Sequence, residues 1–110
     1  MDYSHITGSK AWDKIHEETF EADLHSEKRD STIISLKTIF NNYPCPSCKS
    51  HLMKYLEEHP IEKAEKLFVW GWELHNDVNL RTNKQIIDYE TAYSTYKKKC
   101  EKVIRLKVKN

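Results

Sequence analysis

Three short stretches of this 110-residue chain hold residue types that carry out redox, metal or cofactor chemistry. The first is Cys45-Pro46-Ser47-Cys48, in which two intervening residues let both sulfurs meet across one helical turn. At a helix N-terminus, free N–H groups and the helix dipole stabilise a thiolate, which is the reactive form of cysteine. The pattern is typical of a redox pair or of half a metal site, and it also occurs with neither role.

The metal interpretation has a definite ligand set. His51 extends the pair to Cys-x2-Cys-x2-His, and His75 or Cys100 supplies a fourth ligand. A zinc-stabilised helical binding module built on Cys45, Cys48, His51 and His75 is therefore the main alternative to redox chemistry. A thioredoxin-like oxidoreductase is a third hypothesis, and it lacks the strand that should precede its cysteines.

The second and third stretches carry rings and amides. In a helix, Trp12 and His16 lie one turn apart on the same face, as an ordinary aromatic core contact or as part of a ring-binding site. The segment His75-Asn76-Asp77-Val78-Asn79 places polar side chains at the end of a strongly apolar helix. Buried polar groups need partners. These groups either pair internally or bind a ligand with planar apolar rings and polar edges, such as isoalloxazine or adenine.

The elements that must position these residues are predicted to be helices. Only two glycines and three prolines occur, and the apolar residues recur at helical spacing. The predicted class is all-α, an antiparallel four-helix bundle with a short fifth helix across it. The predicted helices span 9–24 with Ser9 as N-cap, 30–43 with Asp30 or Ser31 as N-cap, 45–59 closed by Pro60, 64–80, and 88–103 with Asp88 as N-cap. Residues 104–109 alternate apolar and basic, which leaves a strand, a helix end or a loose tail open.

Charge and composition exclude several classes of function. The net charge of +1 argues against nucleic acid as the main partner, and no apolar run is long enough for a membrane span. The first fifteen residues contain no secretory signal. Residues 97–110 hold seven of the 18 Lys and Arg residues, so we expect a body of 1–96 and a basic extension of 97–110. Cys100 lies on an apolar stripe and is expected to be a buried free thiol.

Together the motifs resemble the Erv/ALR sulfhydryl oxidases. The matching features are Gly8-x3-Trp12-x3-His16, Tyr43-Pro44-Cys45-x2-Cys48, Trp70, and His75-Asn76-x-Val78-Asn79 followed by Lys84, in the family's order from Gly8 to about Tyr96. The resemblance implies an FAD-dependent thiol oxidase with FAD at one end of a four-helix bundle. Electrons would pass from a dithiol protein through the Cys-x-x-Cys to FAD and on to molecular oxygen, giving hydrogen peroxide.

The same resemblance assigns roles to individual residues. Cys45 and Cys48 would form the redox disulfide, with Cys48 facing the flavin and Cys45 exchanging with substrate. Tyr96 stands where the family usually has Trp. The residues implied to bind FAD are Gly8, Ser9, Lys10, Trp12, His16, Tyr43, His75, Asn76, Val78, Asn79, Lys84 and Tyr96; no metal site is implied.

Three departures from the family pattern point to a short member. The Cys-x16-Cys structural disulfide is missing, and Tyr89 stands near the place of its second cysteine. No second cysteine pair offers a shuttle. Ser9 replaces a common Arg. Such a domain looks most like those of large DNA viruses, which implies a thioredoxin-like or viral structural protein as substrate. The compartment would be host cytoplasm or virion for a viral protein, and the mitochondrial intermembrane space for a cellular one. Family members dimerise through their first helices, so we expect a homodimer that uses apolar surface from Phe20, Ile34 and Ile39.

Overall fold

The computed structural model describes the backbone of residues 8–108 and the side chains of residues 10–101. Within these ranges every regular element is helical, which confirms the predicted all-α class. No helix in this part of the chain combines the length and apolarity needed to cross a bilayer. The elements are α1 (Gly8–Leu24), η1 (Ser26–Lys28), α2 (Arg29–Asn41), α3 (Pro46–Glu58), η2 (Ile61–Lys63), α4 (Leu67–Arg81) and α5 (Tyr89–Val108), where η marks a 3₁₀ turn.

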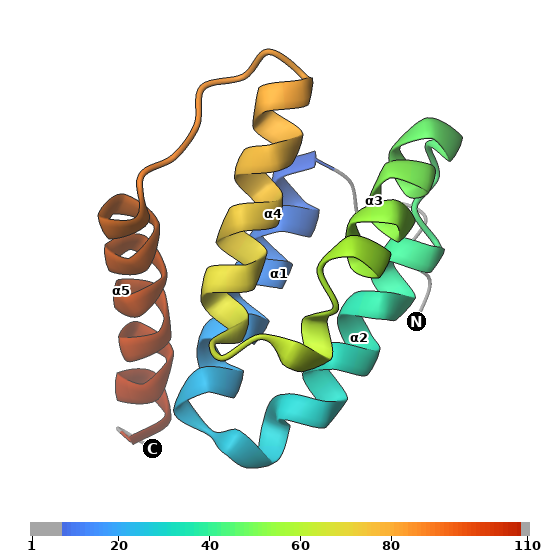
Figure 1. Cartoon of the computed structure of the whole chain (residues 1–110). Coiled ribbons are helices and arrows are strands. Elements are labelled where there is room, and N and C mark those ends of the chain that lie inside the picture. The colour runs from blue at the N-terminus through green and yellow to red at the C-terminus, as the bar shows by residue number, and fades with distance from the viewer. Residues whose placement is uncertain (1–7, 109–110) are drawn as a thin grey trace.

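Helix α1 is the centre of the arrangement, because it packs against α2, α4 and α5, while α3 lies on α2 (Figure 1). The main core forms where α1 to α4 meet, and Leu36, Leu67 and Leu74 are almost completely buried in it. A second, smaller cluster of Phe20 and Phe68 with Ala92 of α5 attaches the last helix. The three chemical stretches therefore sit on α1, α3 and α4 around one core.

The N-terminal caps of the helices show which helix starts are set by local sequence and which are set by distant residues. Asp88 caps α5 as predicted, since its carboxylate accepts hydrogen bonds from the Thr91 N–H and hydroxyl. The fourth helix starts later than predicted, at Leu67 rather than at residue 64. Its first N–H groups, those of Leu67 and Phe68, are capped by the carboxylate of Asp23 from α1, each at 2.9 Å. This cap comes from a distant part of the chain.

The other predicted ends have mixed outcomes. Helix α2 begins at Arg29, before the expected caps, and the Ser31 hydroxyl instead donates to the Lys28 carbonyl. Pro46 occupies the first turn of α3, as expected. Residues 104–108 continue α5, so the expected boundary at 96/97 falls within one helix. The side chain of Ser9, the predicted cap of α1, lies outside the described residues.

The apolar surface expected for a dimer is smaller than the sequence implied. Phe20 and Ile39 are 5% and 1% exposed, because both pack inside the chain. Ile34 alone of the three faces solvent, at 66% exposed.

Candidate functional site

The cysteine pair sits at the start of α3. Cys45 is the N-cap residue, and its Sγ accepts a hydrogen bond from the Cys48 N–H at 3.3 Å. The Ser47 hydroxyl lies 3.3 Å from the same sulfur. In this structure both cysteines are free thiols. The local sequence produces this arrangement, because Pro46 begins a helix without needing its own N–H and leaves the next donors pointing at Cys45.

These contacts separate the two thiols electrostatically. A hydrogen bond from the Cys48 thiol, helped by the Ser47 hydroxyl and the Cys48 N–H, lowers the pKa of Cys45 to about 7. Donating that bond raises the pKa of the Cys48 thiol, and burial adds to the effect. In the reduced pair, Cys45 is therefore the thiol that ionises first, near neutral pH.

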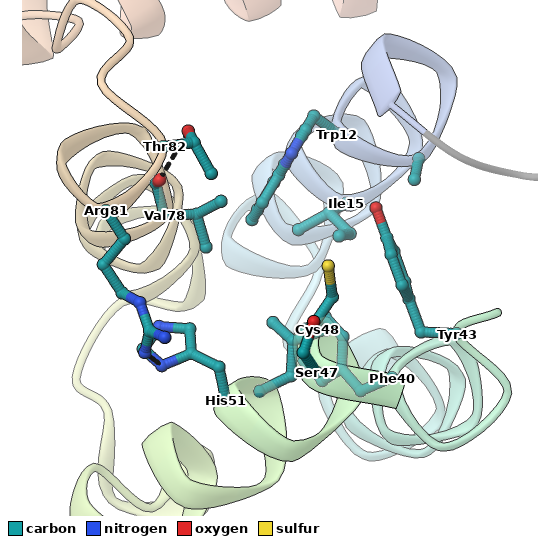
Figure 2. Close-up of a pocket in the computed structure, with 12 residues that line it drawn as sticks. Trp12, Ile15, Phe40, Tyr43, Ser47, Cys48, His51, Val78, Arg81 and Thr82 are labelled. Atoms are coloured by element: carbon teal, nitrogen blue, oxygen red, sulfur yellow. Dashed lines mark hydrogen bonds between the residues drawn. The ribbon is translucent and has the colours of Figure 1, made fainter. Parts of the chain in front are cut away.

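Cys48 lines a cavity of about 200 Å³ between α1, α2, α3 and α4. Figure 2 shows its sulfur pointing toward Ile15, between the rings of Trp12 and Tyr43. The volume is below the roughly 300–1,000 Å³ typical of a whole small-molecule site, so it suits one planar part of a larger ligand. The lining residues are Ala11, Trp12, Ile15, Phe40, Tyr43, Ser47, Cys48, His51, Leu52, Val78, Arg81 and Thr82.

Beside the cavity, three rings from two helices form a stack. The planes of Trp12 and His75 are nearly parallel, with centroids 4.0 Å apart and 5° between them. The ring centroid of His16 lies 5.9 Å from that of Trp12, and both rings are on the shared face of α1 that the spacing predicts. His16 Nε2 and His75 Nδ1 share a hydrogen bond of 2.8 Å.

Both histidines of the stack are neutral at pH 7. Burial, with the adjacent His75 ring, lowers the pKa of His16 to about 4. Burial, with the nearby Lys84 ammonium, lowers the pKa of His75 to about 4 as well. His16 is 2% exposed, and its Nδ1 is buried with no hydrogen-bond partner among the described residues. A buried ring nitrogen without a partner is costly, and a bound ligand would satisfy it.

The two asparagines of the third stretch behave differently. The Asn76 amide binds both polar groups of the Ile87 backbone, donating to its carbonyl and accepting from its N–H, each at 2.8 Å. Asn79 is 5% exposed, and its side-chain amide makes no hydrogen bond to another described residue. Asn76 is therefore paired internally, while Asn79 keeps hydrogen-bonding capacity for a ligand.

The remaining residues assigned to FAD lie at the edges of this region. Tyr96 lies beside His16, with centroids 5.0 Å apart, and its hydroxyl donates to Asp13 at 2.7 Å. Lys84 follows α4, and its N–H donates to the Asn79 carbonyl at 2.8 Å. Lys10 is exposed on α1 and is not one of the cavity-lining residues. Gly8 and Ser9 begin α1, and their side chains lie outside the described residues.

Sequence reasoning missed part of the cavity wall. The sequence indicates His51 only as a zinc ligand, and it indicates Arg81 only as part of the polar exit from the fourth helix. His51 Nε2 lies 2.7 Å from the Asp77 carboxylate, and the Arg81 guanidinium donates to Nδ1 of the same ring. The three-residue step from Val78 to Arg81 on α4 is the signal that would have placed Arg81 on the cavity side.

The zinc-ligand set is not assembled. His51 is bonded to Asp77 and Arg81, while His75 is stacked on Trp12 and bonded to His16. Over the described part of the chain, no three His, Cys, Asp or Glu side chains gather as a metal site would require.

The comparisons with known proteins agree on one family. The model of the Erv1 / Alr family matches residues 9–101. An African swine fever virus protein named FAD-linked sulfhydryl oxidase is 29% identical over 101 residues, covering 88% of this chain and 85% of the relative. The yeast protein FAD-linked sulfhydryl oxidase ERV2, from Saccharomyces cerevisiae, is 27% identical over 93 residues, covering 81% of this chain and 47% of the relative. No solved structure matches the chain.

Proposed function

The chain belongs to the Erv1 / Alr family, and from that premise we propose that it is an FAD-linked sulfhydryl oxidase that forms disulfides in a partner protein. The observation that carries the proposal is the placement of the cysteine pair. Cys48 lines an apolar cavity beside Trp12, while Cys45, three residues earlier, lies outside the set that lines it. We therefore assign Cys48 to the ring-sized space and Cys45 to the exchange with a substrate thiol.

The residues around the cavity fit FAD. His16 Nδ1 is a buried atom without a hydrogen-bond partner among the described residues, and Trp12 and Tyr96 supply ring surfaces beside His16. Asn79 is a buried residue whose side-chain amide makes no hydrogen bond to another described residue. We assign the isoalloxazine to the cavity that Cys48 lines, at one end of a four-helix bundle of α1 to α4. When bound, FAD supplies the two-electron acceptor that reoxidises the cysteine pair and passes the electrons to oxygen as hydrogen peroxide.

The cysteines perform thiol–disulfide exchange. A substrate thiolate attacks Cys45 Sγ of the Cys45–Cys48 disulfide, the S–S bond breaks, and Cys48 leaves as a thiolate. A second substrate thiolate then attacks the mixed disulfide, which releases Cys45 and an oxidised substrate. The substrate loses two electrons and two protons, and the cysteine pair gains the electrons. The lowered pKa of Cys45, about 7, leaves a large share of this thiol ionised near pH 7, ready to re-form its bond with Cys48.

The partner is a dithiol protein, and the enzyme acts as a homodimer through Ile34 and its surroundings on α2.

Cys100 stays outside the redox step, since it is 5% exposed in the cluster that attaches α5. Burial, with the carboxylates of Glu21 and Glu17, raises the pKa of its thiol. Residues 1–96 form the oxidase domain, and the basic run from 97 is an extension of its last helix.

Sedimentation tests the proposed homodimer. At micromolar concentration the wild-type protein should have twice the mass of one chain, and Ile34→Lys should have the mass of one chain. A wild-type monomer would contradict the dimer.

The test is a spectrum followed by turnover. The purified protein should absorb near ~450 nm and should consume oxygen with dithiothreitol, producing peroxide. Cys48→Ser and Cys45→Ser should both keep FAD and lose turnover, and Cys45→Ser should show long-wavelength charge-transfer absorbance from the Cys48 thiolate. Cys100→Ser is the matched control and should stay active. A colourless protein whose melting temperature rises with zinc but not with FAD would contradict the proposal.

A further inference from the structure

We propose that His51 is a positioning residue that ties the cysteine-bearing end of α3 to α4 and so holds Cys48 at the flavin cavity. The inference rests on the proposed function, because it assigns the part that His51 plays in that same site. The ring lies between two side chains of α4: Asp77 at 2.7 Å from Nε2, and Arg81, whose guanidinium donates to Nδ1.

The partners fix which nitrogen carries the proton. A guanidinium can only donate, so Nδ1 of His51 accepts from Arg81. Nε2 therefore carries the hydrogen and donates it to the Asp77 carboxylate. Both ring nitrogens are used, and the ring cannot rotate without losing both bonds. Because the His51 side chain is 15% exposed, its bond to Asp77 is screened less by solvent than the bond of a fully exposed pair.

The place of the contact decides its consequence. His51 follows Cys48 by one turn on α3, and both side chains line the same cavity. Asp77 and Arg81 lie one turn apart on the facing helix. Figure 2 shows the His51 ring reaching from α3 toward Arg81, beside the Cys48 side chain that points into the cavity. A shift of His51 relative to α4 therefore moves Cys48 as well.

Two further contacts join α3 to α4 at the far end of α3. Trp70 Nε1 donates to the His59 carbonyl at 2.9 Å, and the rings of Tyr55 and Trp70 meet edge to face at 5.7 Å. Among the described residues, the hydrogen bonds from the cysteine-bearing half of α3 to α4 are those of His51. Cutting this tie frees the end that carries the cysteines, and cutting the Trp70 contact does not.

The experiment compares the contacts at the two ends of α3, in the FAD-loaded full chain. His51→Leu keeps much of the side-chain volume and removes both bonds, whereas His51→Gln keeps a donor for Asp77. Trp70→Phe is the matched control that loosens the far end. Each is measured for kcat and KM with dithiothreitol, for melting temperature, and, combined with Cys45→Ser, for charge-transfer absorbance.

His51→Leu should lose most of the charge-transfer absorbance and about 10- to 100-fold in kcat, with KM unchanged, because a reacting sulfur displaced by about 1 Å reacts far more slowly. His51→Gln should recover most of both signals. Trp70→Phe should lower the melting temperature and keep both the charge-transfer absorbance and the wild-type kcat. Asp77→Ala, which removes a partly exposed carboxylate without opening the core, should repeat the His51→Leu loss, and the double variant should fall no further.

Two results would overturn the inference alone. One is a wild-type charge-transfer band and kcat in His51→Leu, and the other is an equal loss in Trp70→Phe, which would mean general loosening. A wild-type protein that binds no FAD would instead overturn the proposed function, and this inference with it.

Discussion

The indole of Trp12 lies flat against the imidazole of His75, with ring centroids 4.0 Å apart and 5° between the planes. The contact joins the central helix α1 to α4, and His75 continues it to His16 through a 2.8 Å hydrogen bond. The rings hold one another in place, so the surface offered to a flat ligand is set before the ligand binds. Preorganisation of this kind lowers the ordering cost of binding.

The two asparagines near His75 give a sharp test of the FAD site. Asn79→Ala should leave the cofactor-free protein about as stable as wild type, because the Asn79 side-chain amide makes no hydrogen bond to another described residue that the change would break. It should also reduce the rise in melting temperature that added FAD produces. Differential scanning fluorimetry with and without FAD measures both quantities.

Asn76→Ala is the matched control and should give the opposite result. It leaves the Ile87 N–H without its partner and the Ile87 carbonyl with Trp72 Nε1 as its remaining side-chain donor, so it should cost about 1–3 kcal/mol of stability without FAD. If Asn79→Ala destabilised the cofactor-free protein as much as Asn76→Ala, Asn79 would have an internal role and the assignment to FAD would be wrong.

The acidity of Cys45 should depend on Cys48. In the reduced protein, iodoacetamide alkylation of Cys45 should have its midpoint near pH 7, since its pKa is lowered to about 7 mainly by the Cys48 thiol. Cys48→Ala removes that donor and should move the midpoint to higher pH. Mass spectrometry of the labelled peptide, in a Cys100→Ser background, follows the reaction. An unchanged midpoint would mean that Ser47 and the backbone set the acidity instead.

The sequence was informative wherever the chemistry is local. Cys45 and Cys48 at the start of α3, Trp12 and His16 one turn apart, and Asp88 as a cap are all encoded within a few residues. Helix class followed from the spacing of apolar residues. The structure then places Trp12, Tyr43, Cys48 and Val78 around one cavity.

What could not be predicted depends on contacts between distant segments. Asp23 caps a helix that begins more than forty residues later, so the start of α4 was placed too early. His51 is engaged by Asp77 and Arg81 of another helix, which removes it from any zinc site. Asn76 and Asn79 have the same side chain, and only the position of the Ile87 backbone decides which one is paired.

Removing the Asp23 carboxylate that caps α4 should lower the free energy of unfolding of the protein. Asp23→Ala leaves the N–H groups of Leu67 and Phe68 without their carboxylate, and it should cost about 0.5–2 kcal/mol in urea unfolding. Asp30→Ala is the control, because Asp30 is exposed in the first turn of α2 and is not its cap. Equal stabilities of the two variants would show that water caps α4 as well as Asp23 does.

The stack of His16 and His75 should make the fold sensitive to mild acid. The pKa of each is about 4 in the folded chain and 6.5 without the fold, so the unfolded chain binds more protons between these values. Stability therefore rises with pH across this window: it is fully present above about pH 6.5 and is lost as the pH falls toward about 4. Urea unfolding of the cofactor-free protein at several pH values should show this slope, which His16→Gln with His75→Gln should flatten. His25→Gln, at an exposed histidine far from the stack, should keep the wild-type slope. If the double variant lost stability with falling pH as steeply as wild type, carboxylates rather than these two rings would be responsible.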